Sequence, residues 1–158
     1  MKKILLLLLA IPVAYALVYP TFSYFSDTEV SVGNTFRAGT WETQAGYLNI
    51  DTGGAKLTGN GGKLHSIILD LNTTQNVTID RMIIDWGVNN GEKIEEIRIG
   101  GATFWSGSEI SDAVLDGEYI LTKKEQLDFT FDSDMQGRSS TITFIMGDSS
   151  EKKIIITP

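Results

Sequence analysis

The part of the chain that decides the fold lies between residues 127 and 146, where it reads LDFTF at 127–131 and TITFIM at 141–146. In both segments every second side chain is large and apolar, and most of the side chains between them are polar. Because successive side chains of a β-strand point to opposite faces, this alternation is typical of a strand with one buried and one solvated face. The two segments therefore predict half-buried antiparallel strands.

The rest of the chain carries the same signal. Between residues 24 and 158 there are 16 Ile, 15 Thr and 5 Val but only 8 Leu and 5 Ala, a composition that favours strands over helices. Further strands are expected at 47–51, 64–71, 77–88, 93–99, 118–122 and 152–157. Turn signals separate them at 52–54, 60–62, 89–91, 100–101 and 116–117. Residues 93–98 also fit a helical turn, so two readings stay open there.

Short strands at this spacing predict an all-β fold, a two-sheet β-sandwich of the jelly-roll or Ig-like kind. No internal repeat or long linker interrupts the chain after the leader, so we expect one domain over residues 24–158. The last expected strand contains three consecutive isoleucines at 154–156, which predicts that both of its faces are covered.

The first 23 residues have the pattern of a signal peptide, a hydrophobic helix that is removed from the mature protein. Two lysines precede an uncharged run at 4–18, which is shorter than the roughly 20 apolar residues that span a bilayer. Small side chains at Thr21 and Ser23 suit signal peptidase and would leave Tyr24 as the mature N-terminus. We therefore expect a secreted, cell-surface protein that meets the membrane only transiently, through its leader.

Two alternatives for the leader stay open. Ala14 and Ala16 also have the spacing that signal peptidase requires. An uncleaved leader would remain as an N-terminal anchor. Both alternatives still place the sandwich outside the cell.

The composition excludes several kinds of chemistry. The chain has no Cys and a single His, His65, so thiol nucleophiles, disulfides and zinc sites built from Cys and His are excluded. The net charge is −7, and loss of the two leader lysines leaves 11 basic against 20 acidic residues, or −9. Such a protein repels nucleic acid. Nothing in the residue order indicates a catalytic residue, a cofactor or a metal ligand.

A resemblance to a known family enters directly behind the leader. The chain reads FSDT at 25–28, GNTF at 33–36 and AGTW at 38–41. This order, placed behind a hydrophobic leader, resembles the N-terminal signature of the TasA and camelysin family, exported β-sandwich proteins that include biofilm matrix fibres and archaeal bundling pilins. The match is densest over residues 25–41. The resemblance implies a jelly-roll subunit that polymerises by donor-strand exchange, with further copies of itself and other matrix or filament subunits as partners.

The segment that the resemblance makes the donor strand covers residues 24–36. Val30, Val32 and Phe36 fall on one face of an extended chain, and acidic residues fall on the other. Inserted into a neighbouring subunit, such a strand would pair its backbone with an open sheet edge and fill apolar pockets. Phe25 belongs to the same expected donor segment. The alternative, that this segment is the first strand of its own sandwich, stays open.

Two other functions compete with a filament subunit. Camelysin-type relatives have been described as metallopeptidases, but the zinc-peptidase motif needs two histidines, and His65 is expected to be a surface or half-buried sheet residue. A monomeric carbohydrate-binding or adhesive module would use exposed aromatic rings, for which the adjacent pair Phe104 and Trp105 is the candidate. Acidic turns at 51–53 and 132–134 lack the spacing of a calcium loop. The leading prediction is therefore a non-enzymatic extracellular filament or matrix subunit.

Asn72 and Asn76 each begin an N-glycosylation sequon, at 72–74 and 76–78. The two asparagines lie at an expected junction between strands, where a glycan would stand on the exterior. Sequons arise often by chance in a chain rich in Thr, so occupancy depends on whether the host glycosylates.

Overall fold

The structure, a computed structural model, describes residues 42–158, so the predicted leader and donor segment lie outside the described residues. The described residues belong to one compact unit that runs from Thr40 to Pro158. This unit contains a single-turn helix and ten strands. Their bounds are α2 Gln44–Tyr47, β1 Leu48–Asp51, β2 Lys56–Thr58, β3 Lys63–Leu71, β4 Val77–Asp85, β5 Ile94–Ile99, β6 Ala102–Glu109, β7 Val114–Leu121, β8 Glu125–Phe131, β9 Ser140–Met146 and β10 Glu151–Ile156.

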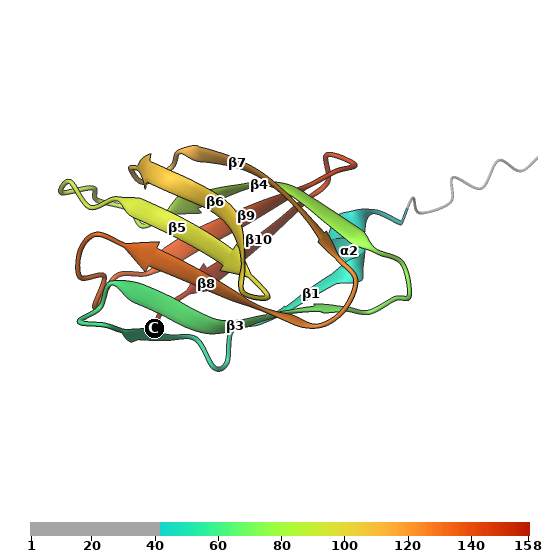
Figure 1. The fold of residues 1–158 in the computed structure, drawn as a ribbon, viewed down its shortest axis with the longest axis horizontal. Helices are drawn as coiled ribbons and strands as arrows, with labels where there is room; N and C mark the ends of the chain where they lie inside the picture. Colours follow the sequence, from blue (N-terminus) through green and yellow to red (C-terminus); the bar gives the residue numbers. More distant parts are fainter. Residues whose placement is uncertain (1–41) are drawn as a thin grey trace, which may run out of the picture. The chain divides into compact units, whose positions relative to one another are not determined.

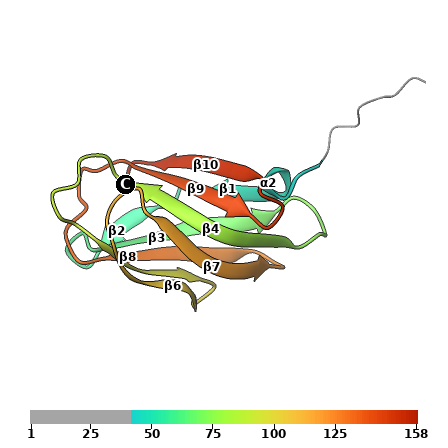
Figure 2. The ribbon, with the colours of Figure 1, turned by 90° about the horizontal axis from the view of Figure 1, so that it is seen from above.

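The strands form two antiparallel sheets (Figure 1). The larger sheet has the order β1-β3-β8-β5-β6, and the short strand β2 pairs with the beginning of β3. The smaller sheet has the order β10-β9-β4-β7. Figure 2 shows the sheets as two layers, with β10 and β1 along one long side and β6 and β7 along the opposite side. The prediction of an all-β fold with two sheets is confirmed.

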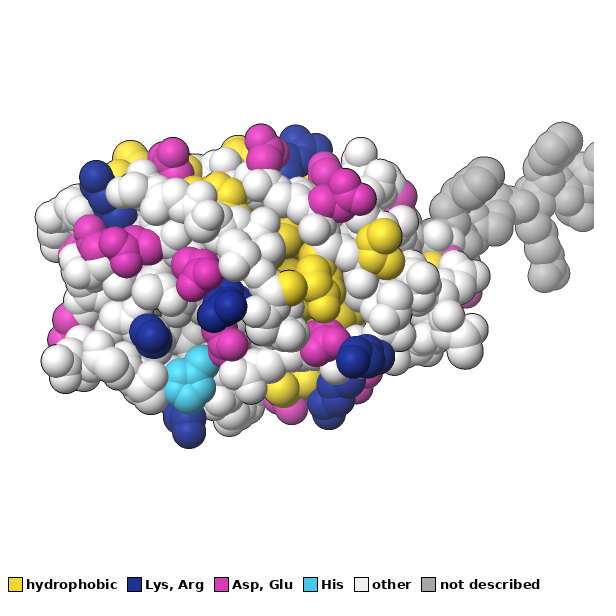
Figure 3. Space-filling model, viewed as in Figure 1, with side chains coloured by type: hydrophobic (Ala, Val, Ile, Leu, Met, Phe, Trp, Pro, Cys, Tyr) yellow, Lys and Arg dark blue, Asp and Glu magenta, His cyan; other side chains and the backbone are white. Residues whose placement is uncertain are grey.

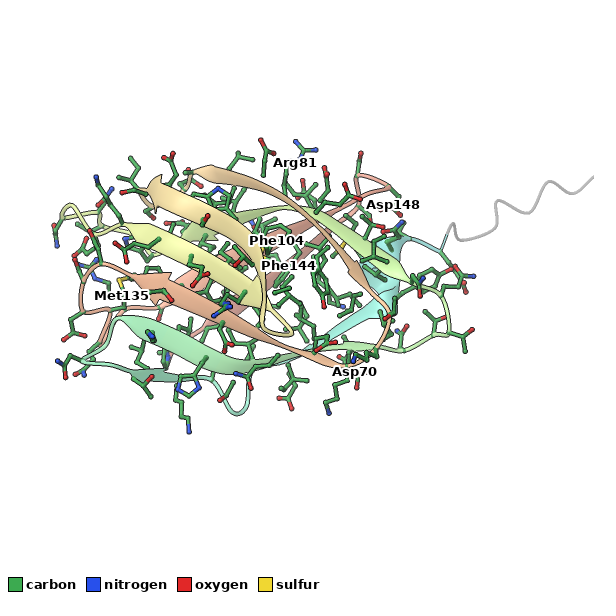
Figure 4. The ribbon with its side chains drawn as sticks, in the orientation of Figure 1. Asp70, Arg81, Phe104, Met135, Phe144 and Asp148 are labelled. Atoms are coloured by element: carbon green, nitrogen blue, oxygen red, sulfur yellow. The ribbon has the colours of Figure 1, made fainter. Side chains whose placement is uncertain are left out.

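The core forms because alternate residues of the facing strands point inward. Phe129 of β8, in the larger sheet, is only 1% exposed, and Phe144 of β9, in the smaller sheet, is fully buried. Phe104 of β6 is also buried, and Figure 4 shows Phe104 and Phe144 near the middle of the molecule. Burial of one such side chain contributes about 1.5–3 kcal/mol. The alternation seen in the sequence at 127–146 is therefore what holds the two layers together.

Residues 93–98 resolve into a strand. In β5 the side chains of Ile94, Ile97 and Ile99 are buried, and the strand pairs with β6 on one side and β8 on the other. Two neighbouring strands satisfy its backbone, so the helical reading is wrong. The strand expected at 77–88 ends at Asp85, because Trp86 and Gly87 leave the sheet to begin a loop.

The turn expected at Asp116–Gly117 is wrong. Strand β7 starts at Val114 and runs through both residues. A Cβ at Gly117 would lie 2.4 Å from the carbonyl oxygen of Phe104 in β6, so glycine is needed here for close approach rather than for a bend.

The isoleucine run of β10 is covered on one face only. Ile156 is buried and Ile154 is half-buried, but Ile155 is 69% exposed. The expectation that both faces are covered is therefore wrong for the described unit, since β10 is an edge strand and its outer face meets solvent.

Candidate functional site

The two long sides of the sandwich differ in how they are closed. On the side of β6 and β7, Gly117 lies directly against the Phe104 backbone, and its missing side chain lets the two sheets meet. The ring of Phe104 is 6% exposed and fills the space beneath. The two sheets therefore approach each other closely on this side, where β6 and β7 are the edge strands.

The opposite side, between β10 and β1, is bridged by one long side chain. Lys152 of β10 points inward, and its Nζ donates to the carbonyl oxygens of Leu48, at 2.5 Å, and Ala45, at 3.4 Å. Both acceptors belong to the segment that begins the other sheet. We call this region, defined by β1, β2 and β10, the open side. A lysine bridge leaves the sheet edges themselves unpaired.

The edge of β10 carries free backbone groups. The Met146 N–H donates to the Ser150 carbonyl at 2.9 Å, which fixes the hydrogen-bonding phase of the β9–β10 ladder. Because N–H and C=O groups alternate in direction along an antiparallel strand, those of residues 152, 154 and 156 point to β9. Those of Glu151, Lys153 and Ile155 point away from it. Within the described residues, no strand pairs with β10 on that side.

Apolar side chains line the open side without being fully covered. Ile50 of β1, Leu57 of β2 and Ile154 of β10 pack against the core but remain partly accessible. A shallow depression of about 350 Å³ lies beside Leu57, between β2 and Pro158. An added strand with one apolar face would cover this incomplete edge of the core.

The short helix α2 fixes the point at which the chain enters the sandwich. The Gln44 N–H donates to Asp148 Oδ2 at 2.8 Å, the Ala45 N–H donates to Ser150 Oγ at 3.0 Å, and the Thr78 N–H donates to Gln44 Oε1 at 2.9 Å. Figure 4 shows Asp148 at the α2 end of the molecule. These contacts anchor α2 to β4 and to the β9–β10 turn, beside the first residue of β10.

The carboxylate of Asp148 depends on this contact. Partial burial opposes its ionisation, but hydrogen bonds from the Ser150 hydroxyl and from the N–H groups of Gln44 and Ser150 outweigh burial and lower the pKa of Asp148. The anchor of α2 is therefore strongest when Asp148 is ionised.

The outer face of the larger sheet carries many charged side chains together with an apolar patch near the middle of the view (Figure 3). Acidic and basic side chains are mixed across this face. His65 is half-buried in β3, as predicted, at a bulge where Ser66 adopts φ 66°. The His65 Nδ1 lies 2.9 Å from Ser66 Oγ. Across residues 42–158, no group of three or more potential metal-ligating side chains comes together.

The two acidic segments considered as calcium ligands form ordinary turns. Asp51 Oδ1 accepts the Gly53 N–H at 2.8 Å, and Asp132 Oδ1 accepts the Lys93 N–H at 2.9 Å. The N–H of Lys93 and the hydroxyl of Ser133 lower the pKa of Asp132. The carboxylates of Asp51 and Asp132 therefore stabilise loops by accepting these backbone hydrogen bonds.

The expected aromatic platform is largely internal. Phe104 is buried and Trp105 is half-buried against the core, so neither ring stands freely on the surface. Of the two adjacent rings Trp105 is the more accessible, but it packs partly against the core.

The two sequon asparagines differ. Both side chains are exposed, but Asn72 Nδ2, the atom that a glycan would occupy, donates to the Gly46 carbonyl at 2.9 Å. In the part of the chain that the structure describes, Asn76 makes no such side-chain bond. Asn76 is therefore the more available acceptor.

The other predicted site residues, Ser23, Tyr24, Phe25, Val30, Val32 and Phe36, lie outside the described residues. Lys152 carried no functional prediction from the sequence, and Gly117 was predicted only as part of a turn. The sequence does contain a signal for Lys152, because it alternates in step with Ile154 and Ile156, and a lysine on the apolar face of a strand is unusual. Among the described residues, no helix is long and apolar enough to cross a bilayer.

Comparison with known proteins gives little. No family model and no curated protein matches the chain. One solved structure that it resembles is the solution NMR structure of a conjugate transposon protein, residues 27–141, from Bacteroides vulgatus. The identity is 10%, the match covers 77% of this chain and 89% of that one, and the TM-score is 0.37. At this level the likeness carries no argument about function.

Proposed function

We propose that this protein is a secreted structural subunit that polymerises into an extracellular filament or biofilm matrix fibre. The mature N-terminal segment, residues 24–36, leaves its own subunit and adds as a strand to the open side of the next copy. The subunit itself is a jelly-roll-like sandwich that lacks one strand. This proposal joins the family resemblance at residues 25–41 to the geometry of the open side.

One observation carries the proposal. On the β6–β7 side the two sheets meet in direct contact at Gly117, whereas on the other side the β10 edge has unpaired backbone groups beside the half-buried isoleucines Ile50 and Ile154. Soluble monomers normally protect such an edge with inward charges, short strands or covering segments. Lys152 gives partial protection only. An edge of this kind is completed when a strand from another molecule pairs with it.

A filament follows from the position of the two partners. The donor segment and the acceptor edge are different surfaces of one chain, so each copy offers one donor and one acceptor. Such a contact is heterologous, and it propagates into a filament unless its rotation closes a ring.

Electron microscopy of the purified mature protein, residues 24–158, tests the proposal. We expect filaments from the parent and none from a variant that lacks residues 24–36. A matched variant, Val30→Asp with Val32→Asp, keeps the length of the segment and removes its apolar face, so it should also fail to polymerise. Normal filaments from either variant contradict strand donation. A persistent monomer whose Trp fluorescence responds to glycans would favour the carbohydrate-binding alternative, and chelator-sensitive proteolysis would favour the peptidase.

A further inference from the structure

We propose that the incoming strand pairs with β10, and not with β1 or β2, because Lys153 on the outer face of β10 receives the acidic face of the donor. This inference rests on the proposed function and specifies which edge of the open side accepts the strand.

The edges of the open side differ in length. Strand β10 has six residues, whereas β1 has four and β2 has three. The Asn72 N–H donates to the Tyr47 carbonyl at 3.0 Å, which fixes the hydrogen-bonding phase of the β1–β3 ladder. The backbone N–H and C=O groups of Leu48 and Ile50 therefore point away from β3, toward the open side. The Leu48 carbonyl already accepts a hydrogen bond from Lys152. Strand β10 therefore offers the longer uninterrupted set of free backbone groups.

The charges on the two edges also differ. The donor segment carries Asp27 and Glu29 on the face opposite its apolar side chains. On β1 the outward positions are Asn49 and Asp51, and Asn49 pairs across the ladder with Asp70, so this edge is acidic. Like charges placed opposite each other on a sheet are destabilising.

Strand β10 carries a basic side chain, Lys153, on its outer face, where Glu151 at the beginning of the strand is also exposed. Lys153 is exposed and lies across from Thr143 in the β9–β10 ladder. Among the described residues it forms no ion pair. A strand beside β10 with its apolar face inward would place Asp27 and Glu29 on the same outer face as Lys153.

The inner face of the same edge fits the apolar side of the donor. Ile154 and Ile156 point inward from β10, with Ile154 half-buried. The donor residues Val30 and Val32 would extend this apolar row. The aliphatic stem of Lys152 adds to it, while its ammonium stays on the Leu48 carbonyl.

A charge-reversal cycle on the mature full-length chain tests the pairing. We expect Lys153→Glu and Glu29→Lys each to raise the critical concentration for polymerisation about fivefold, the size expected for exposed pairs. The double variant should return to within about twofold of the parent. Lys63→Glu is the matched control, since Lys63 is exposed on β3 in the other sheet and the change in net charge is the same. This control should leave the critical concentration within about twofold of the parent.

Hydrogen exchange locates the edge directly. On assembly, the amides of Glu151, Lys153 and Ile155 should exchange at least about tenfold more slowly. Filaments that protect Leu48 and Ile50 instead, or a double variant no better than its single variants, would overturn the inference and leave the proposed function standing. If no condition yields filaments from the parent, the proposed function fails and this inference fails with it.

Discussion

Replacing Gly117 by alanine should open the closed side of the sandwich. A Cβ at this position would stand 2.4 Å from the carbonyl oxygen of Phe104 and 2.9 Å from two carbons of its ring, whereas real Cβ atoms essentially never come within 3.0 Å of a heavy atom outside their own and the adjacent residues. The carbonyl is part of strand β6 and cannot rotate away. The whole of β7 must therefore move away from β6, in a region where the core is tightly packed.

The cost follows from this geometry. Overpacking of a core usually costs 1–3 kcal/mol, and a clash with backbone belongs at the upper end, so we expect a loss of about 3 kcal/mol in the free energy of unfolding. With a urea dependence of about 1.5 kcal/mol per molar, the denaturation midpoint should fall by about 2 M. Urea titrations followed by Trp fluorescence and by circular dichroism measure this shift.

Two controls separate the clash from a general intolerance of alanine. Gly46→Ala adds a Cβ whose nearest neighbour, Thr43 Oγ1, is 3.7 Å away, so it should be neutral or slightly stabilising in the α2 turn. Gly117→Ala combined with Phe104→Ala should not recover the lost stability, because the closest contact is with the backbone. A Gly117→Ala midpoint within about 0.3 M of the parent would refute the account of how this side closes.

Three further predictions concern the open side and the α2 end. Lys152→Met leaves the Leu48 carbonyl without its donor and should lower the free energy of unfolding, measured by urea denaturation, by about 1 kcal/mol. Lys152→Arg should keep most of that stability. Equal losses for the two variants would argue against the lysine bridge. The pKa of Asp148 is lower in the folded state than in the unfolded state, where it is about 3.9. The ionised carboxylate therefore stabilises the fold fully above the unfolded-state pKa, and this stabilisation is lost as the pH falls through the folded-state pKa. Asp148→Asn should therefore reduce the pH dependence of stability below about pH 4, and an unchanged acid limb would contradict this. If the host glycosylates this protein, mass spectrometry should find the glycan on Asn76, because the Asn72 side-chain amide is already bonded to the Gly46 carbonyl. A glycan on Asn72 alone would contradict this prediction.

The strands that could be predicted are those whose side chains face two different environments. In β8 and β9 each inward residue is buried by the facing sheet and each outward residue meets water or a neighbour, so the pattern is visible in the sequence. Strands β2 and β6 were missed because they lie at sheet edges and are largely exposed, so little alternation is imposed on them. Pairing with a neighbour, rather than their own composition, makes them strands.

The candidate site was predictable only in part. An amphipathic segment at 24–36 and an isoleucine run at 154–156 both appear in the sequence, and both indicate a strand that needs a partner. The sequence does not show which edge is open, because openness is a relation between strands that are far apart in the chain. Lys152 meets the Leu48 carbonyl across 104 residues, and no local pattern encodes that contact.

Sequence alone determined that this chain is a β-protein, since period-two alternation and β-branched residues act over neighbouring positions. Tertiary structure decided the meaning of Gly117, which resembles a turn residue but lies inside a strand, where the absence of a Cβ lets two sheets meet. It also decided that β10 is an edge and that one side of the sandwich is closed while the other is not. The physical reason is that alternation of apolar and polar residues depends only on which face of a strand is buried, so it is visible in the local sequence. Whether a strand is the edge of its sheet depends on whether another strand lies beside it, which the local sequence does not show.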